Sequence, residues 1–157
     1  MKTRRATAGS LGFTLIEIVI AVAITGVLVS LGIQSYANYR ERMRVNQAET
    51  EISVMSVAIM VYTQDASTPP DSLAQVGAAG KLDPWGRPYE YFNLVARKGN
   101  GQARKDKNLN PLNSDFDLYS VGKDGSTSSS LMAKASRDDV IRASDGRFIG
   151  LAKDFDP

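Results

Sequence analysis

The stretch "GFTLIEIVIAVAITG", residues 12–26, decides the fold, because it opens an apolar run of membrane length. From Phe13 to Ile33 the only ionisable side chain is Glu17. A helix needs about 20 apolar residues to cross the hydrocarbon core of a bilayer. A charge at the centre of such a helix costs about 2.5–3.5 kcal/mol on insertion scales, so it marks a functional residue that needs a partner. The sequence therefore predicts a membrane-spanning helix with a single carboxylate.

Helical periodicity continues beyond this span. Apolar residues recur at spacings of three and four, which predicts one helix face packed against protein. The stripe consists of Val45, Ala48, Ile52, Met55, Ile59 and Tyr62. The stretch from Asp65 to Pro70 breaks the pattern and ends in two prolines. We expect one helix of about 50 residues, with its first half in lipid and its second half on a globular head.

The rest of the chain predicts a small antiparallel sheet. Residues 89–95 and 115–122 have the composition of strands, and "DGRFIGLA", residues 145–152, is a candidate last strand. Residues 97–110 are rich in Lys and Arg and predict a solvated loop or hairpin. A long helix on a small sheet gives an α+β fold with a C-terminal loop region.

The composition excludes several classes of function. The chain has no His and no Cys, which rules out Ser-His-Asp and Cys-His catalysis, His-based zinc sites and disulfides. A formal net charge of +2 is too small to indicate nucleic acid as the main partner. We therefore predict a protein that is not an enzyme. The metal chemistry that remains is that of oxygen ligands, hence of a hard cation such as calcium.

Residues 12–17, G-F-T-L-I-E, follow a short basic leader and resemble the processing and assembly motif of type IV pilin-like proteins. The resemblance implies the pilin-like fold and cleavage by a prepilin peptidase between Gly12 and Phe13, followed by N-methylation of Phe13. It also implies that Glu17 accepts the new terminal ammonium of a neighbouring subunit, since an ion pair offsets the cost of burying either charge. The alternative for Glu17 is a carboxylate that reaches back to the membrane surface.

The implied organisation is a leader at 1–12, a transmembrane and filament-core helix at 13–33, and a periplasmic head at 34–157. Three later stretches resemble the major pseudopilin of type II secretion: "YTQDASTPPDSL" (62–73), "DPWGRPYEY" (83–91) and "FDLYSVGKDG" (116–125). This branch implies a structural subunit of a periplasmic pseudopilus that acts as a piston or screw in the secretion of folded exoproteins.

The implied location is the inner membrane, crossed once, with the C-terminal part in the periplasm, and later a periplasmic filament. The implied partners are further copies of the chain, minor pseudopilins, the prepilin peptidase, an inner-membrane assembly platform and, before assembly, membrane lipid. Two alternatives stay open. One is a subunit of an extracellular type IV pilus, for adhesion, twitching or DNA uptake, and the other is a monomeric membrane-anchored binding protein.

The pseudopilin resemblance also implies calcium, which holds the C-terminal loop of that group where ordinary pilins use a disulfide. Calcium takes six to eight oxygen ligands, and the acidic residues of this region could supply several of them. The candidate ligands are Asp117, Asp124, Ser126, Asp138 and Asp139. The alternative is that these residues form turns and a solvated surface.

Overall fold

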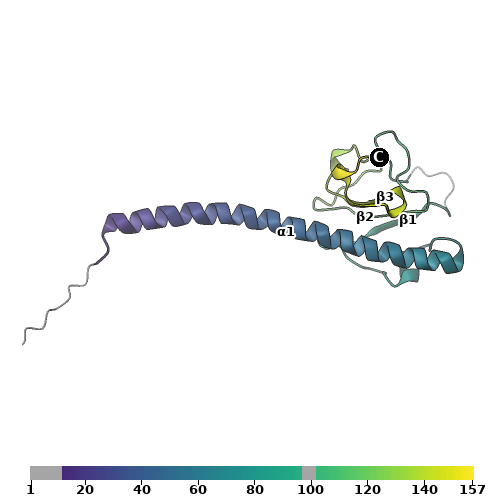
Figure 1. Cartoon of the computed structure of the whole chain (residues 1–157), viewed down its shortest axis with the longest axis horizontal. Coiled ribbons are helices and arrows are strands. Elements are labelled where there is room, and N and C mark those ends of the chain that lie inside the picture. The colour runs from purple at the N-terminus through teal and green to yellow at the C-terminus, as the bar shows by residue number, and fades with distance from the viewer. Residues whose placement is uncertain (1–11, 97–101) are drawn as a thin grey trace, which may run out of the picture. The chain divides into compact units, whose positions relative to one another are not determined.

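The computed structural model describes residues 12–96 and 102–157, and the chain forms two compact units, Met1–Arg40 and Glu41–Pro157. We call them the N-terminal unit and the head unit. Helix α1, Leu15–Ala66, contributes to both (Figure 1). The basic leader and the first part of the predicted 97–110 loop fall outside the described residues. The limits predicted for leader, span and head stay predictions.

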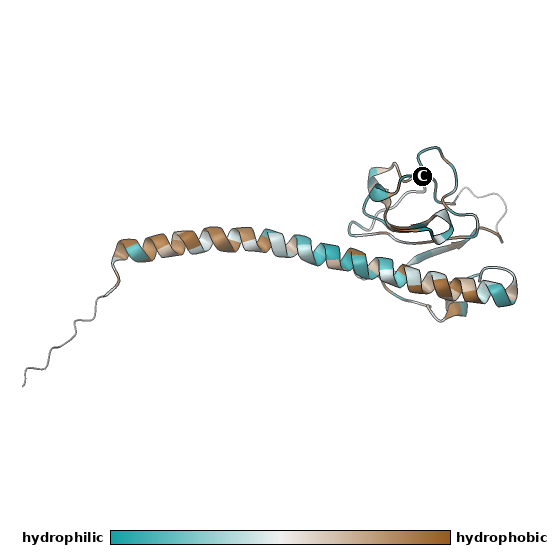
Figure 2. Cartoon of the chain, viewed as in Figure 1, coloured by the Kyte–Doolittle hydropathy of each residue, from teal (hydrophilic) through white to brown (hydrophobic). Residues whose placement is uncertain are grey.

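In the N-terminal unit, α1 is apolar and its described residues are exposed. Its 18-residue window of highest mean hydropathy reaches 2.5 and is long and apolar enough to cross a membrane (Figure 2). Every residue from 12 to 40 is exposed. Apolar surface on this scale requires lipid or other chains to cover it.

Helix α1 ends where the sequence predicted. Its last residue is Ala66, and Ser67 turns the chain with a φ of 61° before the two prolines. Both proline carbonyls accept hydrogen bonds from the first strand, β1 (Glu90–Asn93): the Tyr91 hydroxyl donates to Pro70 at 2.7 Å, and the Asn93 amide donates to Pro69 at 2.8 Å. The segment after the helix is thereby fastened to the sheet.

Four strands form one antiparallel sheet in the order β1-β2-β3-β4. After β1 come β2 (Phe116–Ser120), β3 (Val140–Ala143) and β4 (Phe148–Leu151). Short 3-10 turns lie at Leu73–Val76, Lys134–Ser136, Ser144–Gly146 and Ala152–Asp154. The predicted α+β fold, with one long helix on a small antiparallel sheet, is confirmed.

The predicted strands correspond to β1, β2 and β4, whereas β3 was not predicted. All four residues of β3 are buried, Arg142 among them. Alternation of apolar and polar residues predicts a half-exposed strand. The sequence of β3 lacks this alternation because both faces of the strand are covered. For the stretch around Val140 the sequence predicted only a calcium-binding loop.

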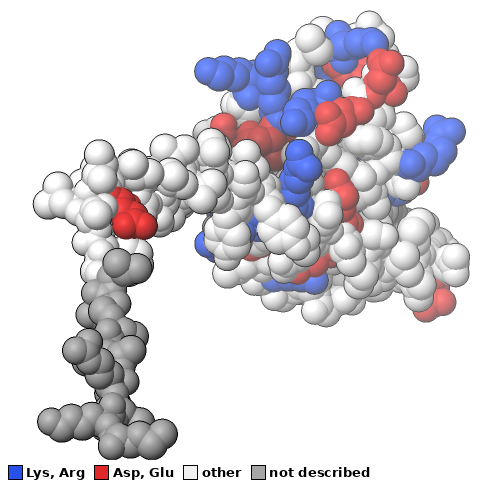
Figure 3. Space-filling view, turned by 60° about the vertical axis from the view of Figure 1, so that its left-hand side comes forward, with Lys and Arg blue, Asp and Glu red and all other residues white. Residues whose placement is uncertain are grey.

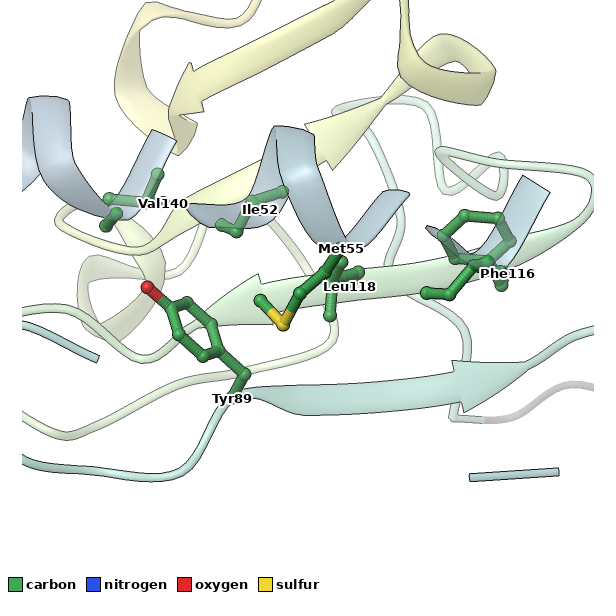
Figure 4. Packing of buried hydrophobic residues seen from close by; sticks show 8 residues of the cluster. Ile52, Met55, Tyr89, Phe116, Leu118 and Val140 are labelled. Atoms are coloured by element: carbon green, nitrogen blue, oxygen red, sulfur yellow. The ribbon is translucent and has the colours of Figure 1, made fainter. Parts of the chain in front are cut away.

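The head unit has two apolar clusters, one on each face of the sheet. The larger joins the helix stripe to the sheet and contains Ala48, Ile52, Met55, Ile59, Tyr89, Phe116, Leu118 and Val140 (Figure 4). The smaller contains Leu112, Leu131, Ile141, Ala143 and Ala152. Val140 and Ile141 belong to different clusters because successive strand residues point to opposite faces. The predicted stripe on the helix is confirmed as the face that packs on the sheet.

Replacing Ile52 by alanine is expected to lower the stability of the head unit by about 3 kcal/mol, since a buried isoleucine leaves a cavity when it is truncated. Ile52 has no exposed surface, whereas Val54 on the same helix is 60% exposed. Val54→Ala should therefore change the free energy of unfolding by less than about 0.5 kcal/mol. Urea unfolding of the full chain in detergent, followed by the fluorescence of Trp85, measures both. Equal losses would contradict the assigned packing face.

Candidate functional site

The residues of the predicted processing site precede α1. Gly12 and Phe13 are exposed and lie outside regular secondary structure, and the helix begins two residues after Phe13, at Leu15. A peptidase can reach such a bond without unwinding a helix. Cleavage and methylation themselves stay predictions.

Glu17 has a partner in its own chain. The main-chain N–H of Thr14 donates to Glu17 Oε2 at 3.4 Å, and the N–H of Glu17 donates to Thr14 Oγ1 at 3.3 Å. This reciprocal pair is a capping box, in which the residue before the helix and the third helical residue satisfy each other's free N–H groups. The sequence carries the signal for this cap, Thr-x-x-Glu before an apolar run.

The capping box does not neutralise Glu17. From Phe13 onward the first cationic side chain in the sequence is Arg40. Figure 3 shows acidic atoms among uncharged side chains near the start of the helix, and Glu17 is exposed. The cap holds the carboxylate beside Thr14, the residue that follows Phe13. Residues 12–39 contain no Lys or Arg, so this stretch offers Glu17 no cationic side chain as a partner.

In the C-terminal region the five predicted calcium ligands separate into two groups. Asp117 and Asp139 are 2% and 0% exposed, and both are already engaged by Arg104. Arg104 Nη2 donates to Asp139 Oδ2 at 2.6 Å, and the main-chain N–H of Arg104 donates to Asp117 Oδ2 at 2.8 Å. Burial raises the pKa of both carboxyl groups, and the Arg104 charge opposes that rise.

The other three candidates shape the turn after β2. Asp138 Oδ2 accepts the main-chain N–H of Asp124 at 2.9 Å, and Asp124 Oδ1 accepts that of Ser126 at 2.7 Å. The turn also needs Gly122, which has a φ of 65°, because a Cβ there would overlap the carbonyl oxygen of Asp138. Asp124 and Ser126 are exposed to solvent.

The five residues do not fit one calcium ion as a set. Over residues 12–96 and 102–157, no group of three or more Asp, Glu, His or Cys side chains is arranged to hold a metal ion. Asp117 and Asp139 do not fit, because the guanidinium of Arg104 already lies against Asp139 and would repel a second cation. Calcium at Asp124, Ser126 and Asp138 stays a prediction that the geometry does not test.

Arg104 corrects the prediction for the basic stretch. We expected a solvated loop, but Arg104 is 2% exposed and its guanidinium carbon lies 4.2 Å from the centre of the Tyr119 ring. By contrast, Lys107 is exposed and pairs with Asp156 at 2.8 Å. The sequence offered no means of telling the two apart, since both belong to the same run of charges.

A second arginine, Arg142 of β3, is also buried. It donates two hydrogen bonds to the carboxylate of Asp115, at 2.8 and 2.7 Å, and one to the Phe116 carbonyl at 3.0 Å. Its guanidinium carbon lies 3.9 Å from the centre of the Phe116 ring. A forked, stacked guanidinium of this kind is strongly oriented, so it links β3 to the start of β2.

A helix that is apolar and exposed in its first half and packed on an antiparallel sheet in its second half defines the class of pilin-like architectures. The comparisons agree with this class. The chain is 28% identical over 135 residues to the type II secretion system core protein G of Pseudomonas aeruginosa. The match covers 73% of this chain and 84% of that protein. No protein-family model and no solved structure matches the chain.

Pilins are among the relatives too. The chain is 46% identical over 54 residues to the type IV major fimbrial protein FimA of Dichelobacter nodosus, which covers 34% of this chain and 35% of that protein. It is 27% identical over 109 residues to the type IV major pilin PilA of Myxococcus xanthus, which covers 69% of this chain and 48% of that protein. Fold and relatives together support a type IV pilin-like family, and with it a pilin or pseudopilin structural subunit.

Proposed function

We propose that the chain is a structural subunit of a periplasmic pseudopilus in type II secretion. The observation that carries this proposal is the extent of the similarity, because the match spans 84% of core protein G but 48% of the pilin PilA. The match to core protein G thus covers most of that protein's length. The three soluble stretches that resemble major pseudopilins support the same branch.

Assembly in this proposal begins in the inner membrane. Cleavage after Gly12 leaves an ammonium group on Phe13, and Glu17 of the neighbouring copy accepts it as the subunit enters the filament. The pair forms among packed apolar helices, where either charge alone would be costly to bury. The exposed apolar surface of residues 12–40 is covered in the same step.

The proposed work is mechanical. An inner-membrane assembly platform adds subunits, minor pseudopilins join the filament, and its growth drives folded proteins outward. The relatives are structural subunits, and a chain without His or Cys fits that role. Within this proposal, calcium would bind only at Asp124, Ser126 and Asp138.

The second candidate is a surface type IV pilus, favoured by the 46% identity to FimA over 54 residues. That similarity covers 34% of this chain and 35% of FimA, and core protein G is also among the relatives. It therefore supports filament formation without separating the two.

A deletion strain separates the candidates. We expect loss of secreted proteins from the medium and unchanged fibres on the cell surface, with both phenotypes read beside a complemented strain. Mass spectrometry of the complementing protein is expected to find an N-terminus at methylated Phe13. Normal secretion together with missing surface fibres would assign the chain to a pilus instead. An intact leader on the working protein would contradict either filament and favour a monomeric anchored protein.

A further inference from the structure

The charge of Arg104 lies where three separate segments of the head unit meet. Its Nη2 donates to Asp139 Oδ2 at 2.6 Å, and its Nη1 donates to Thr127 Oγ1 at 2.6 Å. Thr127 Oγ1 in turn donates to the same Asp139 oxygen at 2.7 Å, which closes a ring of hydrogen bonds. The ring joins the segment before β2 to Thr127, inside the long connection between β2 and β3, and to Asp139, the last residue of that connection.

Two further contacts hold Arg104 in place. It stacks on the ring of Tyr119 in β2, and the main chain of Arg104 donates to Asp117 of the same strand at 2.8 Å. Asp117 also accepts the Asn113 amide at 2.9 Å. The ion pair between Arg104 and Asp139 is buried on both sides, with side-chain exposures of 3% and 0%.

We infer that Arg104 is the built-in cation of the C-terminal region. Its guanidinium occupies the place at Asp139, and its main-chain N–H the place at Asp117, where the resemblance led us to expect a metal ion. A buried carboxylate needs a cation or several donors beside it. A guanidinium supplies both at once, with a charge and directed hydrogen bonds. Asp139 Oδ2 is thereby paired with a residue of the chain itself, while the buried Oδ1 of the same carboxylate has no hydrogen-bond partner among the described residues.

A second arginine acts in the same way at the beginning of the connection. Arg87 Nη1 donates to the carbonyl oxygen of Gly122 at 2.8 Å and approaches that of Lys123 at 3.4 Å. Main-chain carbonyls are common calcium ligands, and here they accept from a guanidinium instead. The connection from β2 to β3 is thus held at both ends by arginines, independently of the proposed function.

Thermal unfolding of the full chain in detergent, followed by Trp85 fluorescence, tests this inference. The wild type and Arg104→Ala are compared in calcium chloride and in EDTA. We expect Arg104→Ala to unfold about 10 °C below the wild type in both media, because it leaves Asp139 buried without a cation. The deciding quantity is the difference between the two proteins in EDTA.

Two further variants make the result specific. Arg137→Ala removes an exposed arginine of the same connection and should leave the midpoint unchanged. Arg104→Lys keeps the charge but not the fork, and it should recover at least part of the loss, including the case in which Arg104→Ala fails to fold. The inference is overturned if Arg104→Lys recovers nothing, or if the wild type in EDTA falls to the midpoint of Arg104→Ala. If EDTA lowers the wild-type midpoint by less than this, and the wild type still unfolds above Arg104→Ala, the result supports the role of Arg104. It then also indicates that calcium binds at Asp124 and Asp138.

Discussion

Glu17→Ala is expected to abolish filament assembly while the head unit stays folded. In the proposed filament the carboxylate is the acceptor for the ammonium of Phe13 on the next copy, and loss of one partner leaves the other charge buried. Breaking a buried pair costs about 3–5 kcal/mol. A loss of about 3 kcal/mol weakens each subunit addition by roughly a hundredfold, which is enough to stop growth. Cross-linking of the membrane fraction should show monomer where the wild type gives a ladder.

Matched variants separate the charge of Glu17 from its cap. Glu17→Gln removes the charge with little change of shape and should fail to assemble as Glu17→Ala does. Thr14→Ala removes a capping hydroxyl but keeps the carboxylate, so it should cost only about 1 kcal/mol and still assemble. The unfolding midpoint of the head, read from Trp85, should be the same in all of them. A normal ladder from Glu17→Gln would refute the proposed role of the charge.

Arg142→Met is expected to destabilise the head unit by about 3 kcal/mol, the low end of the range for breaking a buried ion pair. Methionine keeps most of the side-chain length over Phe116, so the loss reports the charge and its hydrogen bonds rather than a cavity. The low end applies because Asp115 is 31% exposed in the pair and regains water when its partner is removed. For a domain of this size the midpoint should fall by about 10 °C.

Arg147→Met provides the control for Arg142, because Arg147 follows β3 closely in the chain and its side chain is exposed. Its effect should be within about 0.5 kcal/mol of zero. A double-mutant cycle with Asp115→Asn then isolates the coupling between Arg142 and Asp115. Additive losses would mean that the two hydrogen bonds between them contribute nothing beyond the separate residues.

The N-terminal capping box is a feature that the sequence alone can predict. Thr14 and Glu17 have the spacing of the motif and precede an apolar run, so their mutual hydrogen bonds could have been predicted. The interaction is local, within one turn of helix. The partner of Glu17 in the proposed filament lies on another copy of the chain, and no pattern within a single sequence places it.

Calcium at Asp117 and Asp139 stays a prediction, and the structure adds a contact there that the sequence did not reveal. Both were expected as ligands from the resemblance and from their carboxylate oxygens, which can bind either a metal ion or a guanidinium. The residue that engages them, Arg104, is 35 positions before Asp139 in the sequence and was counted among solvated charges. Only the folded head unit shows that Asp117 and Asp139 are buried and that Arg104 lies against Asp139.

The sequence by itself determined the elements whose signal is local: the length and end of α1, its apolar first half, the stripe that packs on the sheet, and three of the four strands. Periodicity and turn residues carry this information within a few positions. Only the tertiary structure decided β3 and the two buried arginines. A charged side chain becomes buried when distant residues supply its acceptors, and Arg142 finds Asp115 across 27 positions. Such a pairing depends on how the chain folds back on itself, which composition and spacing do not encode.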